Sequence, residues 1–282
     1  MARLSVVNHD RDAAGMTYVY PVVSRRARGV SVGINLNPNN ACNWRCVYCQ
    51  VPDLVRGKAP QIDLTKLESE LSTMLQSIVH GDFMQMNVPQ EFRRLNDIAL
   101  SGNGEPSTCA QLQEVLQIVE GALQRFELMG KIKLVMISNG SMAGQDHVQD
   151  ALRYMAGLGG QVWFKLDRAT AQGLQATNSV RMRPEDHLQR LETVAGCVPT
   201  YVQTCMFQVE GAPPSDAEVQ AYLDALRSLV ARGVGLKGVL LYGLARPSMQ
   251  VEAPLLSAVP AEWLQALGAR IQSLGLPVTV TP

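Results

Sequence analysis

Three cysteines that lie close together in the sequence are the residues best suited to chemistry. Cys42, Cys46 and Cys49 follow the spacing C-x3-C-x2-C, so their thiolates can reach a single metal centre from one loop. Structural zinc and [4Fe–4S] clusters usually take four protein ligands, whereas this loop supplies three and no obvious fourth. An iron that lacks a protein ligand can accept a substrate or a cofactor, as a catalytic zinc keeps an open position.

Other interpretations of this loop remain open. They are a zinc site, an electron-transfer cluster completed by a remote cysteine, and three incidental buried cysteines. The remaining cysteines are scattered singly: Cys109, Cys197 and Cys205. We expect each to be a small buried hydrophobic residue. Cys109 and Cys205 also lie near predicted carboxyl ends of strands, where a hydrogen-donor role is the alternative.

Polar residues gather at the predicted ends of strands. The motif SGNGEP, residues 101–106, follows a short apolar run, and its glycines allow a close backbone approach and positive φ. Lys165 and Asp167 are two residues apart and therefore project to one side of a strand, where they serve a site or form a structural ion pair. Further candidates are Ser138, Asn139, Gln203 and Arg246, with an Asn-Gly turn at Asn139 and a solvated surface arginine at Arg246 as alternatives. We expect Arg25 and Arg26 to form an exposed basic turn, and the alternatives are that they cover the mouth of the site or hold a substrate phosphate.

The elements that must position these residues alternate along the chain. Short apolar runs typical of strands covered on both faces occupy residues 30–37, 97–101, 131–138, 161–167, 200–207 and 236–244, and a trailing run covers 277–281. Helical periodicity appears at residues 64–78, 112–126 and 219–230. Capping boxes are expected at Thr108 with Gln111 and at Ser215 with Glu218, and Pro184 and Pro260 are expected at first helical positions.

Six strand–helix units predict an α/β fold with a parallel sheet and right-handed crossovers. Six units are too few for a complete eight-unit barrel, so we expect a partial (β/α)6 TIM-like barrel, with a doubly wound sheet as the alternative. In both architectures the chemistry belongs at the carboxyl ends of the strands.

The composition narrows the class of protein. Of 282 residues, 46% are hydrophobic and 18% are charged, which is typical of a globular chain that folds without disulfides. Twenty-five basic residues balance 25 acidic ones, so net charge does not favour nucleic-acid binding. No run approaches the ~18 apolar residues of a membrane helix, and charge comes too early for a signal peptide. We therefore expect a cytoplasmic protein with no membrane contact.

The cysteine loop, with Tyr48 before its third cysteine, resembles the signature of radical S-adenosylmethionine (SAM) enzymes. In that superfamily three cysteines bind a [4Fe–4S] cluster whose fourth iron chelates SAM. The resemblance implies that an electron from the cluster cleaves SAM to methionine and a 5′-deoxyadenosyl radical, which abstracts hydrogen from a substrate. The protein orients this chemistry and excludes side reactions.

The SGNGEP motif resembles the GGE-type motif of the same superfamily. The resemblance implies that Gly102, Asn103, Gly104 and Glu105 bind the SAM amino group and that Tyr48 supports the adenine side. It also makes Ser138, Asn139, Lys165, Asp167 and Gln203 candidates for SAM or substrate contacts. Lys165 and Arg246 are the candidate catalytic residues.

Several stretches resemble the wyosine-synthase-like group of radical SAM proteins in particular. They are residues 20–26, 32–35, 138–140, 162–167 and 241–247, together with the two motifs above. Members of that group that use pyruvate carry a second cluster on upstream cysteines, and this sequence has no cysteine before Cys42. Because the chain is also neutral, we do not infer tRNA modification.

The sequence thus predicts a radical SAM enzyme, of oxidoreductase, transferase or lyase type, with a barrel at residues 30–282 after an N-terminal extension at 1–29. The resemblance implies a flavodoxin- or ferredoxin-like electron donor. The substrate, whether a small molecule, a nucleoside or a protein, is not resolved. An activase that modifies a partner protein and a non-catalytic electron-transfer module are the alternatives.

Overall fold

The computed structural model describes residue 4 and residues 14–24 and 29–282. Arg25 and Arg26, for which the sequence leaves an exposed turn or a role at the mouth of the site open, lie outside the described residues. Among the described residues, no helix combines the length and the apolar character that a bilayer crossing requires.

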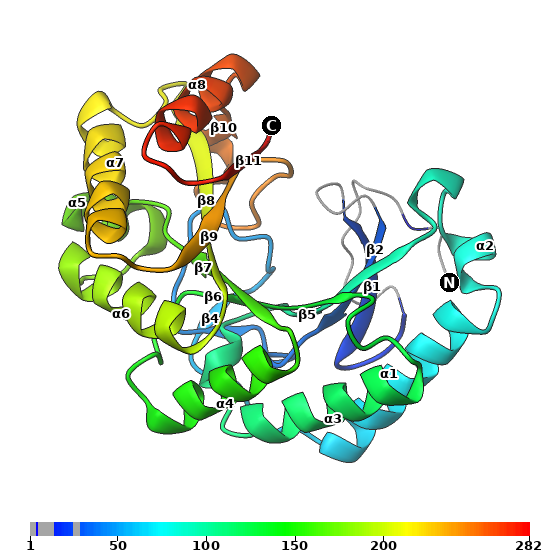
Figure 1. Ribbon diagram of the computed structural model, residues 1–282. Coiled ribbons are helices and arrows are strands. Elements are labelled where there is room, and N and C mark those ends of the chain that lie inside the picture. Colours follow the sequence, from blue (N-terminus) through cyan, green and yellow to red (C-terminus); the bar gives the residue numbers. More distant parts are fainter. Residues whose placement is uncertain (1–3, 5–13, 25–28) are drawn as a thin grey trace.

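A curled sheet organises the molecule (Figure 1). Its strand order is β1-β2-β5-β6-β7-β8-β9-β11, with β10 paired to β8. Strands β2 to β11 along this order run parallel, whereas β1 and β10 pair antiparallel. The two ends of the order, β1 and β11, are not paired with each other, so the sheet forms a partial barrel. The predicted (β/α)6 fold class is confirmed.

The strands of this sheet are β1 (Val19–Ser24), β2 (Gly29–Ile34), β5 (Leu95–Leu100), β6 (Lys133–Ser138), β7 (Gln161–Lys165), β8 (Thr200–Val209), β9 (Leu236–Gly243), β10 (Leu256–Ala258) and β11 (Val278–Thr281). All six predicted strands and the trailing one are present. Strand β8 is longer than expected because β10 pairs with its last three residues. Strand β1 lies in the segment predicted as an N-terminal extension and hydrogen-bonds to β2 along its whole length.

Helices connect the parallel strands and lie on the outer side of the sheet (Figure 1). They are α1 (Leu64–Val79), α2 (Phe83–Asn87), α3 (Leu112–Arg125), α4 (Asp146–Gly157), α5 (Ala171–Asn178), α6 (Pro184–Cys197), α7 (Asp216–Ala231) and α8 (Ala261–Gln272). Single 3₁₀ turns occur at η1 (Gln90–Phe92), η2 (Pro106–Thr108) and η3 (Ala253–Leu255). The three helices predicted from periodicity correspond to α1, α3 and α7.

The observed starts of the helices differ in part from those predicted from the sequence. Pro184 holds the first helical position as expected, but Pro260 is the N-cap and α8 begins one residue later. Ser215 caps α7 by accepting from the Glu218 amide, whereas the Glu218 carboxylate turns away to the Thr170 hydroxyl. The second expected capping box is only half formed.

The other expected capping box, at Thr108 and Gln111, is wrong. Both side chains bind the loop that precedes α1: the Thr108 hydroxyl accepts from the Ala59 amide at 2.9 Å, and the Gln111 carboxamide accepts from the Ile62 amide at 2.7 Å. The two side chains that the local spacing predicted to cap a helix therefore form hydrogen bonds to a distant loop instead.

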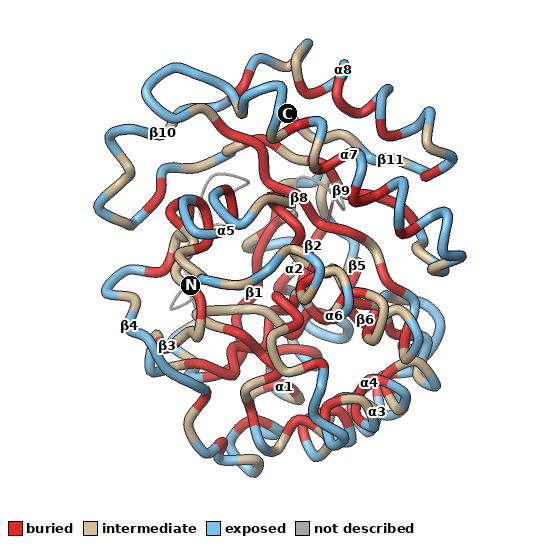
Figure 2. The backbone as a smooth tube through the Cα atoms, turned by 90° about the vertical axis from the view of Figure 1, so that its left-hand side faces the viewer, coloured by how far each residue is buried: buried red, intermediate tan, exposed pale blue. Residues whose placement is uncertain are grey.

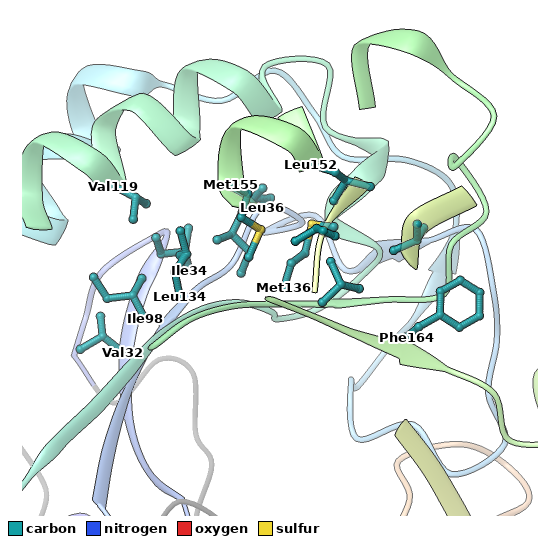
Figure 3. Packing of buried hydrophobic residues seen from close by; sticks show 14 of the residues in the cluster. Val32, Ile34, Leu36, Ile98, Val119, Leu134, Met136, Leu152, Met155 and Phe164 are labelled. Carbon is teal, nitrogen blue, oxygen red and sulfur yellow. The ribbon is translucent and has the colours of Figure 1, made fainter. Parts of the chain in front are cut away.

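The core lies between the sheet and the helices. Inward and outward side chains alternate along each strand, and the outward set includes Val32, Ile34, Ile98, Leu134 and Met136 (Figure 3). These side chains pack against α1, α3 and α4 and are almost completely buried. Burial extends along most of the strands, while the helices expose their outer sides (Figure 2). Each buried aliphatic side chain contributes about 1.5–3 kcal/mol, so this face stabilises the fold.

Candidate functional site

A cavity of about 340 Å³ lies on the inner face of the sheet. All three clustered cysteines line it, as do Gly102 to Glu105 of the glycine-rich motif. Side chains from several parallel strands and from the turns that follow them complete the wall, as expected for chemistry at the carboxyl ends of strands. The structure therefore brings the two motifs, more than 50 residues apart in the sequence, to one cavity.

The cysteine loop begins after β2 and passes through a small two-stranded sheet. Strand β3 (Ala41–Cys42) pairs in parallel with β4 (Val55–Arg56), and the Asn37 carboxamide donates to the Ala41 carbonyl at 2.9 Å. Burial raises the pKa of the Cys42 thiol to about 12 and that of the Cys46 thiol to about 11. In the metal-free protein both thiols are therefore neutral. A bound metal cation reverses this, because it deprotonates a thiol that coordinates it.

The end of α5 holds the loop on both sides of Cys46. The Arg45 amide donates to the Asn178 carbonyl at 3.3 Å, and the Val47 amide donates to the Thr177 carbonyl at 2.9 Å. These carbonyls belong to the last turn of the helix, where they have no partner within it. The Arg45 guanidinium also contacts both carboxylate oxygens of Glu252 at 2.7 Å.

The segment after β9 holds the third cysteine. The Ser248 hydroxyl donates to the Val47 carbonyl at 2.7 Å, and the Met249 amide donates to the Cys49 carbonyl at 2.8 Å. The loop backbone is thus fixed by residues of α5 about 130 positions away and by Ser248 about 200 positions away. Such contacts carry no local sequence signal.

The glycines of the SGNGEP motif permit a close approach to the cysteine loop. Gly102 has a φ of +148°, and a Cβ there would lie 2.5 Å from the Asn35 Oδ1 atom. A Cβ on Gly104 would collide with the Ala41 carbonyl oxygen. The Asn103 amide donates to the same Asn35 Oδ1 at 3.0 Å. Glycine is therefore required here because two loops meet, in addition to any contact with a cofactor.

Glu105 ties this motif to the end of β6. Its carboxylate accepts from the Ser107 hydroxyl at 2.6 Å, the Ser138 hydroxyl at 2.7 Å and the Asn139 amide at 2.6 Å. Burial raises the pKa of Glu105, and these hydrogen bonds oppose the rise. Glu105 and Asn139 line the cavity, whereas Ser138 is buried next to Glu105 and is not among the described residues on the wall.

Lys165 presents a fixed positive charge to the cavity. Its ammonium group lies 4.8 Å from the centre of the Tyr48 ring and donates to the Tyr242 hydroxyl at 3.4 Å. Burial is the largest influence on the pKa of Lys165 and lowers it, but Asp167 together with Tyr242, Cys46 and Cys205 outweighs burial and raises the pKa above its usual value. The side chain therefore stays protonated and can attract an anionic group.

Asp167 lies next to the cavity wall and not on it. Its carboxylate accepts from the Tyr48 hydroxyl, from the Cys205 amide at 2.9 Å and from the Asn178 carboxamide at 3.0 Å. Burial opposes the charge of Asp167, but Lys165 and these hydrogen bonds lower its pKa below the usual value. The predicted ion pair with Lys165 acts through charge, since the described residues hold no direct contact between the two within 4.0 Å.

Other predicted residues fall on the same wall. Gln203 and Cys205 are two residues apart on β8 and therefore share the face that lines the cavity. Arg246 lines the cavity from the segment after β9. Cys109 is completely buried in the core and does not reach the cavity, so the structure corrects its alternative role as a hydrogen donor. Sequence reasoning missed further wall residues, namely Tyr20, Ser31, Asp97, Trp163 and Tyr242.

Two other residues beside the site were missed. Asn178 donates from its carboxamide to the Cys46 sulfur at 3.2 Å and is completely buried. His187 of α6 contacts the Trp44 ring, at 5.2 Å between centroids, and shares a hydrogen bond of 2.9 Å with the Lys165 carbonyl. Burial lowers the pKa of His187 to about 4. Neither residue belongs to a ligand-like spacing, so only the three-dimensional contacts reveal them.

The donor set can be tested against a cluster. Three thiols on one loop line the cavity, and the Asn178 N–H group faces the Cys46 sulfur. An N–H donor favours a sulfur that carries negative charge, as a ligating thiolate does. Thiols are the ligands that iron–sulfur clusters take from proteins, so the three cysteines on this cavity wall fit such a group.

Comparisons of the sequence with known proteins assign no family. No family model matches the sequence. Among curated proteins, GTPase Obg of Brachyspira hyodysenteriae (strain ATCC 49526 / WA1) is 21% identical over 132 residues, and the match spans 47% of this chain but only 17% of that protein. A match of this identity and coverage carries no functional assignment.

Solved structures of radical SAM enzymes are similar over most of the chain. A radical SAM methyltransferase from Sphaerobacter thermophilus matches with a TM-score of 0.58 and 14% identity over 93% of this chain and 68% of that one. TYW1 with a lysine–pyruvate adduct bound matches with a TM-score of 0.54 and 14% identity, over 88% of this chain and 74% of that one. SuiB of Streptococcus suis, bound to S-adenosylmethionine, matches with a TM-score of 0.52 and 10% identity, over 88% of this chain and 45% of that one. The chain therefore has the fold of radical SAM enzymes.

Proposed function

We propose that this protein is a radical SAM enzyme that holds a [4Fe–4S] cluster on Cys42, Cys46 and Cys49. When bound, the cluster and SAM together supply a 5′-deoxyadenosyl radical for hydrogen abstraction from a substrate. The observation that carries the proposal is the position of the three-thiol loop: it lines a cavity on the inner face of a partial barrel that radical SAM enzymes share.

The residues around the cavity suit the binding of SAM. The turn formed by Gly102 to Glu105 presents backbone groups beside the cysteine loop and would meet the methionine amine. Tyr48, whose hydroxyl is fixed by Asp167, would support the adenine side. The protonated Lys165 lies on the cavity wall and would attract the carboxylate of SAM through its charge.

The remaining predicted residues take less defined roles in this proposal. Asn139, Gln203 and Arg246 lie on the cavity wall and would contact SAM or the substrate. Ser138 would act through Glu105, to which it donates a hydrogen bond. Of these groups, Lys165 and Arg246 are the candidates for contact with the reacting substrate.

The partners of the enzyme follow from the proposed chemistry. Reduction of the cluster needs a strong one-electron donor, and we propose a flavodoxin- or ferredoxin-like protein. The substrate would enter the same cavity, and its class stays open. We assign the barrel to residues 30–282 and the extension to residues 1–29, with β1 added to the edge of the sheet. A reducing, cytoplasmic environment suits free thiols that must bind iron.

Anaerobic reconstitution with iron and sulfide, followed by addition of SAM and dithionite, tests the proposal. We expect 5′-deoxyadenosine and methionine to form, and we expect neither product from the Cys46→Ala variant. A protein that binds the cluster but yields no 5′-deoxyadenosine would be an electron-transfer module. A protein that binds no iron would contradict both functions.

A further inference from the structure

We propose that Asn178 is a positioning residue that makes the cluster easier to reduce by donating a hydrogen bond to the Cys46 sulfur. This inference rests on the proposed function, because it concerns the same cluster site. Neither the spacing of the cysteines nor the glycine-rich motif points to Asn178, which comes from the end of α5, 132 residues after Cys46.

The Asn178 side chain is enclosed and close to the sulfur. Its Nδ2 atom lies 3.2 Å from the Cys46 Sγ atom and 3.0 Å from the Asp167 Oδ2 atom. The residue has no solvent exposure, so water cannot replace the N–H group if it is removed. Each of the two Nδ2 hydrogens therefore has an acceptor of its own, one carboxylate and one sulfur.

Asp167 fixes which way the carboxamide faces. An ionised carboxylate only accepts hydrogen bonds, so the NH₂ side of Asn178 must point toward it. The same orientation directs the second N–H toward the sulfur. The Asn178 Oδ1 atom is buried and has no hydrogen-bond partner in the described part of the chain. Leaving a buried acceptor unpaired is costly, so the contacts on the Nδ2 side outweigh the need to satisfy the oxygen.

The backbone of α5 keeps Asn178 at this position independently of its side chain. The Asn178 and Thr177 carbonyls accept from the amides on either side of Cys46, at 3.3 and 2.9 Å. A substitution that changes only the Asn178 side chain leaves both of these hydrogen bonds in place. The loop and the N–H donor can therefore be altered separately.

Hydrogen bonds to the sulfurs are among the factors that set the reduction potential of an iron–sulfur cluster. Reduction adds negative charge to the cluster and its thiolates, and an N–H dipole aimed at a sulfur stabilises that charge. The effect is large in a buried site because the local dielectric is low. Loss of the Asn178 donor should therefore make the potential more negative.

The test compares reduction potentials in the reconstituted full chain without SAM, by titration followed with electron paramagnetic resonance. Asn178→Leu and Asn178→Val each remove the donor without adding a charge. We expect both variants to shift the midpoint to more negative potential by about 59 mV, a tenfold change in the reduction equilibrium. Thr177→Val, one residue away on the same helix, is the matched control and should leave the midpoint unchanged.

The outcomes separate this inference from the proposed function. If both Asn178 variants bind iron and keep the wild-type midpoint, Asn178 does not tune the cluster and the inference is overturned. It is also overturned if the variants lose iron but the clusters that remain have the wild-type midpoint, because Asn178 is then a structural residue only. A wild-type protein that binds no cluster contradicts the proposed function itself.

Discussion

The two faces of the curled sheet differ in how they are held together. The outer face consists of apolar side chains packed against helices, and strand β7 contributes Val162 and Phe164, both completely buried. The inner face bears Trp163 and Lys165 of the same strand, which line the cavity. Because side chains alternate along a strand, neighbouring residues of β7 either stabilise the core or line the cavity.

Hydrogen bonds and charges organise the inner face where apolar contacts organise the outer one. The buried carboxylates of Glu105 and Asp167 each connect segments distant in sequence, and both lie beside the cysteine loop. Substitutions on the inner face should therefore change cofactor binding first. Substitutions on the outer face should change the free energy of unfolding first.

The largest effect is expected on the inner face at Cys46. Cys46→Ala removes one of three thiolates, so the brown colour of the reconstituted cluster and the cleavage of SAM should both be lost. The circular dichroism spectrum should stay that of the wild type, because the loop backbone is held by α5 and by the segment after β9. Retention of either the colour or the cleavage would falsify the ligand assignment.

On the outer face the corresponding change is Phe164→Ala. Its ring is completely buried and packs 4.9 Å from the His187 ring, measured between centroids. Loss of this side chain should lower the free energy of unfolding by about 3–5 kcal/mol. Urea unfolding of the metal-free protein measures this change. An equally stable variant would show that the outer face does not carry the stability assigned to it.

His187 links the two faces, and its effect depends on pH. Burial lowers its pKa to about 4 in the folded state, from an ordinary value of 6.5. When the pH falls below 6.5, unfolded chains gain a proton that folded chains do not, so stability falls as the pH drops toward 4. The loss attributable to this residue is about 3 kcal/mol.

Urea unfolding of the wild type and of His187→Gln, at pH about 7 and about 5, isolates this contribution. The variant should lose less stability between the two values than the wild type does. Equal losses in both proteins would mean that His187 does not stay neutral when it is buried.

A smaller effect is expected at Lys165. Lys165→Met keeps the length of the side chain but removes the cation from the cavity, and it should raise the Kd for SAM about tenfold, or about 1.4 kcal/mol. Calorimetry on the reconstituted protein measures this change. Lys133→Met, at the exposed start of β6, is the control. If both variants bind SAM as the wild type does, the cation has no role in binding.

Much of the fold could be predicted from the sequence because the parallel strands are covered on both faces and read as apolar runs. The same alternation placed Lys165, Gln203 and Cys205 on the inner face. Strands β3 and β4 have two residues each and carry no periodic pattern. Residues 108 and 111 matched a local capping rule but serve a tertiary contact, which overrides the local signal.

The candidate site divides in the same way. Cys42, Cys46 and Cys49 share a spacing, so sequence alone could identify them. Asn178 and His187 act through contacts between segments far apart in the chain, and no spacing marks them. Residues that define a site are therefore easier to predict than residues that support it.

The most direct test of this account is electron paramagnetic resonance of the dithionite-reduced, anaerobically reconstituted protein, recorded with and without SAM and accompanied by iron analysis. The account predicts about four irons per chain and a cluster signal that changes when SAM is added, because one iron lacks a protein ligand. Absence of iron, or a cluster signal that SAM leaves unchanged, would contradict it.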